Sequence, residues 1–194
     1  YFSAPVELVG VVGDDFPKQY TEMLGQHNVD LEGLQIIKGE KTFRWGGKYH
    51  YDLNVRDTLF TDLNAFENFN PVLPERYKKS RYICLGNIDP ILQMRVLDQV
   101  ADPQFVVCDT MNLWINLMKP DLQKLLKRVH VFILNDSEAR MLTEEPNLIK
   151  AAKLIRQMGP EILIIKKGEH GAMLFTKDTI FSAPAFPMEI IFDP

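Results

Sequence analysis

Val129-His-Val-Phe-Ile-Leu-Asn-Asp-Ser-Glu-Ala-Arg-Met-Leu-Thr143 carries the strongest structural signal in this sequence. A short apolar run bounded by polar residues predicts a buried strand, and Asn135 begins a segment whose apolar residues recur at helical spacing. Where a strand leads into a helix in an α/β protein, the strand end and the exposed N–H groups of the helix together favour ligand binding. Asn135 and Glu138 lie at this junction. The same pair also fits a capping box, in which each side chain satisfies a backbone donor of the first turn.

The composition is that of an ordinary globular protein. The chain has 194 residues, 46% of them hydrophobic and 25% charged, and its net charge of -4 gives no basic footprint for nucleic acid. No run of eighteen apolar residues predicts a membrane span and no signal peptide is recognisable, so we expect a cytoplasmic protein that binds neither nucleic acid nor membrane. Cys84 and Cys108 each lie in an apolar run, which favours buried thiols in a reducing cytosol over a disulfide.

Strands and helices alternate along most of the chain. Val6–Val12 predicts a first strand that leads into a helix, and helical patterns such as Ile91–Val100 and Leu148–Met158 separate later strands. Four such strands are expected: Tyr82–Leu85, Phe105–Cys108, Val131–Leu134 and Ile162–Ile165. This alternation predicts a mostly parallel sheet with right-handed crossovers. Three short runs near the end predict an antiparallel edge: Ala172–Thr176, Thr179–Ser182 and Met188–Phe192.

Residues 34–63 break this rhythm. Thr42–Trp45 and Lys48–Tyr51 alternate in residue type and flank Gly46-Gly47, a pair typical of a two-residue hairpin turn. Thr58–Thr61 predicts a further strand. We therefore expect residues 34–63 to form a small antiparallel lid with an aromatic face, and residues 1–33 and 64–194 to form the α/β core.

Polar residues follow each of the four central strands. They are Asn87 and Asp89, Asp109 and Asn112, Asn135 and Glu138, and Lys166-Lys-Gly-Glu-His-Gly171. In a parallel sheet these exits share one edge. Each group by itself fits a cap or a turn, but four together favour a single site. Walker, G-x-S-x-G and H-E-x-x-H motifs are missing, and the four histidines do not have the spacing of zinc ligands.

With these motifs the chain resembles the ribokinase-like carbohydrate kinases, also called the phosphofructokinase-B type. Ile133–Thr143 is similar to the family's strand and N-x-x-E segment, and Ile164–Ala172 is similar to its strand and K-x-G-x-x-G turn. Leu8–Phe16 is similar to its V-G-x-V-G-D-D-x-F stretch. The resemblance implies a ribokinase-like three-layer α/β sandwich with a mostly parallel central sheet, antiparallel edge strands and a small β-sheet lid.

The resemblance also implies an ATP-dependent kinase that uses Mg2+ and phosphorylates a hydroxyl of a sugar or nucleoside. Asn135 and Glu138 would hold the magnesium–water–phosphate arrangement, with Glu138 acting through water. Gly168 and Gly171 would let the backbone pass close to the nucleotide. The other implied site residues are Lys166 or Lys167 beside the nucleotide, Asn87 on the sugar side, Arg44, Trp45 and Tyr49 on a lid that closes over the acceptor, and Asp109 and Asn112 as a loosely matched phosphate rim.

The sequence departs from the family pattern at three places. Glu144 stands where the family usually has Gly, which predicts a differently built helix exit. The family's T-G-A-G-D segment, with its anion hole and catalytic Asp, would follow a strand such as Glu189–Pro194, and a G-G-x-x-x-N segment would precede Tyr1. We therefore expect both ends to be cut from a longer protein, the catalytic base to lie beyond Pro194, and the 194 residues alone to be inactive.

Two other interpretations stay open at this level. In the first, the chain belongs to a catalytically silent protein of the same fold that binds nucleotide or sugar. In the second, every motif is only a cap or a turn. Family members often dimerise through the lid, and the aromatic alternation at Phe43, Trp45, Tyr49 and Tyr51 is compatible with a homodimer or with a covered core face.

Overall fold

The computed structural model describes residues 5–51 and 55–189. Contacts divide the described residues into two units, residues 5–78 and residues 79–189. The predicted division into a core and a lid at residues 34–63 stays a prediction. No helix among the described residues is both long enough and apolar enough to cross a membrane.

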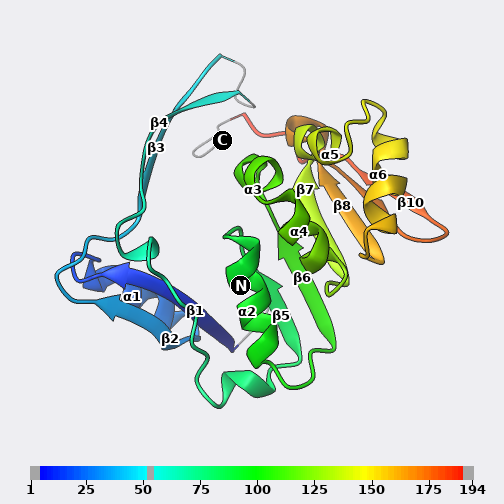
Figure 1. Ribbon diagram of the computed structural model, residues 1–194. Coiled ribbons are helices and arrows are strands. Elements are labelled where there is room, and N and C mark those ends of the chain that lie inside the picture. Colours follow the sequence, from blue (N-terminus) through cyan, green and yellow to red (C-terminus); the bar gives the residue numbers. More distant parts are fainter. Residues whose placement is uncertain (1–4, 52–54, 190–194) are drawn as a thin grey trace. The chain divides into compact units, whose positions relative to one another are not determined.

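The second unit is built on a six-stranded sheet with the order β10-β9-β8-β7-β6-β5 (Figure 1). Its strands are β5 (Tyr82–Leu85), β6 (Phe105–Asp109), β7 (Val131–Asn135), β8 (Ile162–Lys166), β9 (Ala172–Phe175) and β10 (Ile180–Ala183). The first four are parallel, and β9 and β10 are antiparallel to their neighbours. The predicted parallel strands and the first two edge strands are confirmed. Met188 and Glu189 are not in a strand, and the rest of that predicted run lies outside the described residues.

Five helices connect or flank these strands: α2 (Pro90–Gln99), α3 (Asn112–Leu117), α4 (Lys119–Leu126), α5 (Asp136–Thr143) and α6 (Leu148–Gln157). Local chemistry explains where α2 and α6 begin. Asp89 accepts a hydrogen bond from the Ile91 N–H (2.7 Å), and Pro90 occupies the first helical position, where its missing N–H costs nothing. Asn147 caps α6 by accepting from Ile149 N and Lys150 N.

The core of this unit lies on one face of the sheet. Side chains two residues apart on a strand point to the same face, and Phe132, Leu134, Leu163 and Ile165 are all fully buried. They pack in one cluster with apolar residues of α4, α5 and α6: Leu122, Leu125, Leu126, Ala139, Leu142, Ala152 and Ile155. Burying a side chain of this size contributes about 1.5–3 kcal/mol. The cluster therefore fixes β7, β8 and the start of α5 as one rigid block.

The two cysteines differ in their surroundings, although neither is in a disulfide. Cys108 is fully buried, as predicted. The prediction of a buried thiol is wrong for Cys84, which is exposed. β5 is the terminal strand of the sheet, and Cys84 shares a face with the exposed Tyr82 rather than with the buried Leu85.

The first unit contains two separate two-stranded sheets. Its elements are β1 (Val6–Gly13), α1 (Lys18–Gln26), β2 (Val29–Ile37), β3 (Arg44–Tyr49), β4 (Arg56–Asp62) and the 3-10 turns at Asn64–Phe66 and Tyr77–Lys79. β1 and β2 are parallel around α1, which confirms the predicted strand–helix unit. The buried Tyr77 supports this sheet, because its hydroxyl donates to the Asp30 backbone O (3.0 Å) and Oδ1 (2.7 Å).

The interpretation of Gly46-Gly47 as a hairpin turn is wrong. Both glycines lie inside β3, which pairs along its length with β4 and has an irregular register between them. The two residues provide room for aromatic rings, since a Cβ on Gly46 would lie 2.3 Å from the Phe60 ring and one on Gly47 would lie 2.3 Å from the Trp45 ring. The predicted strand at residues 58–61 is confirmed as part of β4.

Candidate functional site

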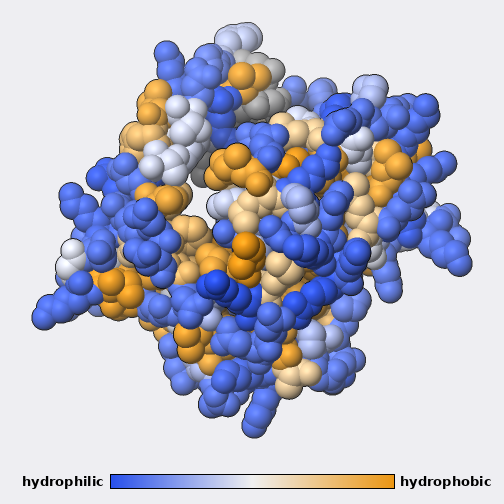
Figure 2. All heavy atoms as spheres, viewed as in Figure 1, coloured by the Kyte–Doolittle hydropathy of each residue, from blue (hydrophilic) through white to orange (hydrophobic). Residues whose placement is uncertain are grey.

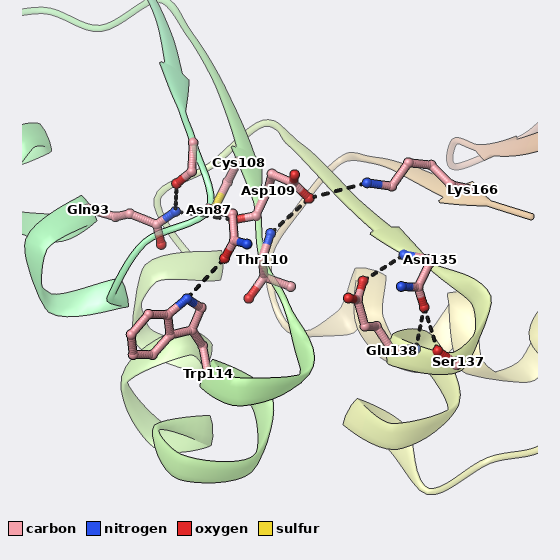
Figure 3. A network of polar contacts seen from close by, with 11 residues as sticks. Asn87, Gln93, Cys108, Asp109, Thr110, Trp114, Asn135, Ser137, Glu138 and Lys166 are labelled. Carbon is pink, nitrogen blue, oxygen red and sulfur yellow. Dashed lines mark hydrogen bonds and ion pairs between the residues drawn. The ribbon is translucent and has the colours of Figure 1, made fainter. Parts of the chain in front are cut away.

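The carboxyl ends of three neighbouring strands bring predicted site residues together (Figure 3). Asp109 ends β6, Asn135 ends β7 and Lys166 ends β8. Lys166 is the register partner of Asn135, and its Nζ lies 3.7 Å from Asp109 Oδ1. The Lys166 side chain is 51% exposed and that of Asp109 is 37% exposed. An ion pair this exposed contributes little to stability, so both groups can turn toward a ligand at small cost.

The start of α5 places a buried carboxylate beside this cluster. Asn135 Oδ1 accepts hydrogen bonds from the Glu138 N–H (2.8 Å) and from the Ser137 hydroxyl (2.7 Å). In return, Glu138 Oε2 accepts from the Asn135 N–H (2.8 Å). The capping box is therefore present, and Glu138 is only 6% exposed. Its negative charge at the positive end of α5 is favourable, and the box fixes the carboxylate one helical turn from the end of β7.

A buried glutamine, which sequence reasoning missed, ties two strand exits together. Gln93 on α2 is 1% exposed, and its Nε2 donates to the backbone O of Gly86 (2.7 Å) and of Asp109 (3.1 Å). Gln93 therefore holds the ends of β5 and β6 in one position. The available signal was a polar residue at helical spacing between the buried Pro90 and Leu97.

Gln93→Leu is expected to lower the free energy of unfolding by about 1–3 kcal/mol, because two backbone carbonyls lose their donor without loss of apolar volume. Urea denaturation followed by circular dichroism measures this change. Gln99→Leu is the matched control in the last turn of α2, where the half-buried Gln99 donates from Nε2 to the backbone O of the exposed Arg95 (3.0 Å), and its expected effect is within about 0.5 kcal/mol. Equal effects of the two substitutions would contradict a special role for Gln93.

Asn87 contacts α3, and Asn112 is the first residue of this helix. Asn87 is exposed after β5, and its Oδ1 accepts from the Trp114 indole N–H (3.0 Å), a second contact that the sequence did not reveal. Asn112 is exposed at the start of α3, and its Oδ1 accepts from the Leu113 N–H (3.0 Å). This bond lies within its own helix, so the structure does not join Asn112 to Asp109 and Lys166. The phosphate-rim roles of Asp109 and Asn112 stay predictions.

The segment after β8 forms the tight turn that its glycines predict. The Lys167 N–H donates to Gly171 O (2.8 Å), and the Gly171 N–H donates to Gly168 O (3.0 Å). Gly168 and Gly171 have φ angles of 55° and 87°. At Gly171 a Cβ would lie 2.0 Å from the backbone O of Ala183. The contact with the end of β10 is therefore sufficient to require glycine at position 171. The role of Gly168 and Gly171 toward a nucleotide stays a prediction.

The exit of α5 retains a left-handed residue although it lacks glycine. Glu144 has φ 57° and ψ 25° at the C-cap, the conformation that glycine adopts with least strain. Its carboxylate lies 3.1 Å from Lys119 Nζ. The substitution therefore leaves the ordinary left-handed helix end in place, and the prediction of a differently built exit is wrong.

The predicted lid residues lie on β3 in the first unit. Trp45 Nε1 donates to Thr58 Oγ1 across the strand pair (3.3 Å), and the Arg56 guanidinium lies 5.8 Å from the Trp45 ring centroid. Figure 2 shows hydrophobic side chains among hydrophilic ones over the β3–β4 sheet. Phe43, Trp45, Leu59 and Phe60 are among the exposed hydrophobic residues. The roles of Arg44, Trp45 and Tyr49 over an acceptor, and a homodimer through this sheet, stay predictions.

Burial controls the chemistry of the thiol behind the site. Burial, followed by the nearby charge of Asp109, raises the pKa of the Cys108 thiol to about 12. The thiol is therefore protonated at neutral pH, and its Sγ donates to the backbone O of Asp109 (3.4 Å). A thiol in this state is no nucleophile. It acts as part of the support beneath the end of β6.

The polar groups at the carboxyl ends of β6, β7 and β8 fit a magnesium ion bound together with phosphate better than a metal ion held by protein ligands alone. The described residues contain no group of three or more His, Cys, Asp or Glu side chains that could hold a metal ion. Mg2+ usually keeps several waters and binds through one or two carboxylates together with substrate phosphates. Asp109, Asn135 and Glu138 offer oxygen atoms of this kind, and Lys166 offers a cation for phosphate oxygens.

Comparisons with known proteins give a family model that matches along the chain and a curated relative. A family model described as "pfkB family carbohydrate kinase" matches residues 1–194. The chain is 26% identical over 196 residues to a cytidine kinase of Thermococcus kodakarensis, a match that covers 98% of this chain and 69% of the relative.

Solved structures show the same fold. A putative ribokinase II from E. coli, in complex with ATP and Mg2+, has a TM-score of 0.80 at 17% identity and covers 96% of this chain and 64% of its own. A nucleoside kinase from Methanocaldococcus jannaschii has a TM-score of 0.75 at 19% identity, with 97% and 61% covered. The chain thus spans less than two thirds of these structures. The predicted ribokinase-like α/β fold class is confirmed.

Proposed function

Because this chain belongs to the pfkB family of carbohydrate kinases, we propose that it supplies the nucleotide side of an active site that transfers the γ-phosphoryl group of ATP to a nucleoside hydroxyl. The observation that carries the proposal is the meeting of Asp109, Asn135 and Lys166 at adjacent strand ends, with the buried Glu138 beside them. Phosphoryl transfer depends mainly on positioning and on neutralising phosphate charge. This edge offers a cation, oxygen ligands and a helix N-terminus for those tasks.

Each residue has a distinct task in this proposal. Lys166, with Lys167 nearby, pairs with phosphate oxygens, and the Gly168–Gly171 turn lets the backbone pass close to the nucleotide. Asn135 and Glu138 hold the water shell of Mg2+, which, when bound, neutralises phosphate charge. Glu138 acts through water, because its Oε2 already accepts from Asn135 N and the side chain is nearly buried.

We propose a nucleoside rather than a simple sugar as the acceptor. Support comes from the curated relative, a cytidine kinase, and from a nucleoside kinase among the similar structures. Trp45 and Tyr49 on β3 provide aromatic faces, and stacking of a base on an aromatic ring is worth about 1–3 kcal/mol. Asn87, held by the Trp114 indole, contributes hydrogen-bonding groups on the sugar side.

We also propose that the general base is not among residues 1–194. Asp109 already accepts from the Thr110 N–H (2.9 Å) and lies near Lys166, and Glu138 accepts from Asn135. Both carboxylates are therefore already engaged by groups of this chain, which leaves them poorly placed to accept a hydroxyl proton. The 194 residues alone are expected to bind MgATP without turning it over.

ADP release by the full-length protein tests this function, with cytidine, uridine, adenosine, inosine, ribose and fructose as acceptors. The expected result is magnesium-dependent release with at least one nucleoside, at a kcat/KM at least about 100-fold above that for either sugar, since a site built for a base leaves its polar groups unpaired with a smaller acceptor. Residues 1–194 assayed in parallel are expected to stay at background.

Each contrary result has its own meaning. A preference for the free sugars would overturn the nucleoside assignment. MgATP binding without turnover on any acceptor by the full-length protein would favour the catalytically silent alternative. Turnover by residues 1–194 would place the base within this chain, and failure to bind MgATP would overturn the nucleotide site itself.

A further inference from the structure

The segment Gly13-Asp14-Asp15, which begins at the last residue of β1, makes several contacts with residues far along the chain. Asp15 Oδ1 accepts from both the Thr42 N–H (2.7 Å) and the Thr42 hydroxyl (2.6 Å). The same hydroxyl oxygen accepts from the Gly13 N–H (3.1 Å). Thr42 is thus attached to the end of β1 through both its backbone and its side chain. It stands two residues before β3 begins.

The other end of the β3–β4 sheet is attached to the same place. Asn64, two residues after β4, donates from Nδ2 to the backbone O of Thr42 (2.9 Å). The Ala65 N–H donates to Lys41 O (2.9 Å). The entering and leaving segments of β3–β4 are therefore joined to each other, and both are joined to β1 through Thr42.

Asp14 adds a second attachment slightly earlier in the chain. Its carboxylate accepts from the Gly39 N–H (2.8 Å), and its own N–H donates to Glu40 O (3.2 Å).

The β3–β4 sheet has little support of its own. Every residue of β4 is exposed, and a two-stranded sheet by itself is at best marginally stable in water. The position of β3–β4 in the first unit therefore depends on its base.

We propose that Asp15, through Thr42, clamps the base of the β3–β4 sheet to the end of β1, and that Asp15 is a positioning residue for the lid. The group Gly13, Asp15, Thr42 and Asn64 is called the Thr42 clasp below. All four residues of the clasp belong to the first unit. Its effect on acceptor binding rests on the proposed function, in which Trp45 and Tyr49 of β3 offer aromatic faces to the acceptor.

The charge on Asp15 supports this assignment. Its hydrogen bonds from the Thr42 hydroxyl and then from the Thr42 N–H lower the pKa of Asp15 below its usual value. The carboxylate is therefore ionised at neutral pH, and the hydrogen bonds it accepts are charge-assisted, which makes them stronger than neutral ones.

Hydrogen exchange of the full-length protein, followed by mass spectrometry, tests the clasp without using activity. Asp15→Ala and Thr42→Val are each expected to raise exchange in the peptides that cover residues 41–49 and 55–65 by about tenfold, while exchange in α6 stays unchanged. Thr42→Ser keeps the hydroxyl and is expected to match the wild type. Glu32→Gln, which removes an exposed ion pair with Arg76 in the same unit, is the matched control with no expected change.

Kinetics then separate the clasp from the lid function. The acceptor KM of Asp15→Ala is expected to rise about tenfold while the ATP KM changes less than about twofold, because a loosened lid weakens the acceptor side. Unchanged exchange in both Asp15→Ala and Thr42→Val would overturn the clasp. Raised exchange with an unchanged acceptor KM would overturn the positioning role. If the full-length protein shows no kinase activity, the proposed function fails and exchange alone still decides the clasp.

Discussion

Glu138→Gln in the full-length protein is expected to lower kcat/KM for MgATP by about 10–100-fold, the usual cost of losing a residue that orients the shell around a metal. The substitution removes the negative charge and almost nothing else. Gln at this position also completes a capping box, so the Asn135 N–H keeps an acceptor. The free energy of unfolding is therefore expected to change by less than about 1 kcal/mol, mainly through the lost helix-dipole interaction.

The measurement combines ADP release at varied MgATP with thermal denaturation of the same samples. Ser137→Ala is the matched control, because it removes a hydrogen bond to Asn135 Oδ1 one residue away without changing charge. A large loss of stability with unchanged kinetics would show that Glu138 serves only as a cap. In that case Asn135 and Glu138 would form a capping box at the start of α5 and nothing more.

Gly171→Ala is expected to lower the free energy of unfolding by at least about 3 kcal/mol. A non-glycine residue at φ 87° and ψ -139° costs roughly 1–3 kcal/mol in backbone strain alone. The added Cβ would also lie 2.0 Å from Ala183 O and 2.7 Å from Ala185 N. Backbone atoms cannot rotate away as a side chain can, so the segment after β10 must move.

Two other glycines separate these causes. Gly39 has φ 81° with nothing within 4 Å of its Cβ position, so Gly39→Ala measures strain alone. Gly25 in α1 is free of both problems, and Gly25→Ala is expected to stabilise by up to about 1 kcal/mol. Chemical denaturation of the three variants gives the comparison. If Gly171→Ala costs no more than Gly39→Ala, the close approach of the two segments has no energetic consequence.

The parts of this fold that were predictable from sequence are those set by local periodicity. The apolar runs at Phe105–Asp109, Val131–Asn135 and Ile162–Lys166 are short, bounded by polar residues and separated by helical patterns, so their strands could be predicted. Their order along the chain also implied that Asp109, Asn135 and Lys166 would meet, because parallel neighbours end at the same edge.

The errors arise where distant residues decide the local structure. Gly46-Gly47 has the composition of a turn, but the partner strand and the Phe60 ring keep it inside β3. Cys84 lies in an apolar run, but its strand has a neighbour on only one side within its sheet. Gln93 looks like an ordinary helix residue until the two carbonyls that it joins are brought together by folding. None of these partners can be identified from the pattern of residues next to the position in the sequence.

The strand order of the second unit also bears on how that unit folds. In the sequence β10-β9-β8-β7-β6-β5 every strand pairs with the strand that precedes or follows it in the chain. Each parallel pairing closes one connection that contains at least one helix, and each antiparallel pairing closes a short turn, so paired strands are closer in sequence than they would be in a sheet with a shuffled strand order. The described strands of this sheet can therefore be added in chain order as the chain leaves the ribosome, because each finds its partner in the strand made just before it.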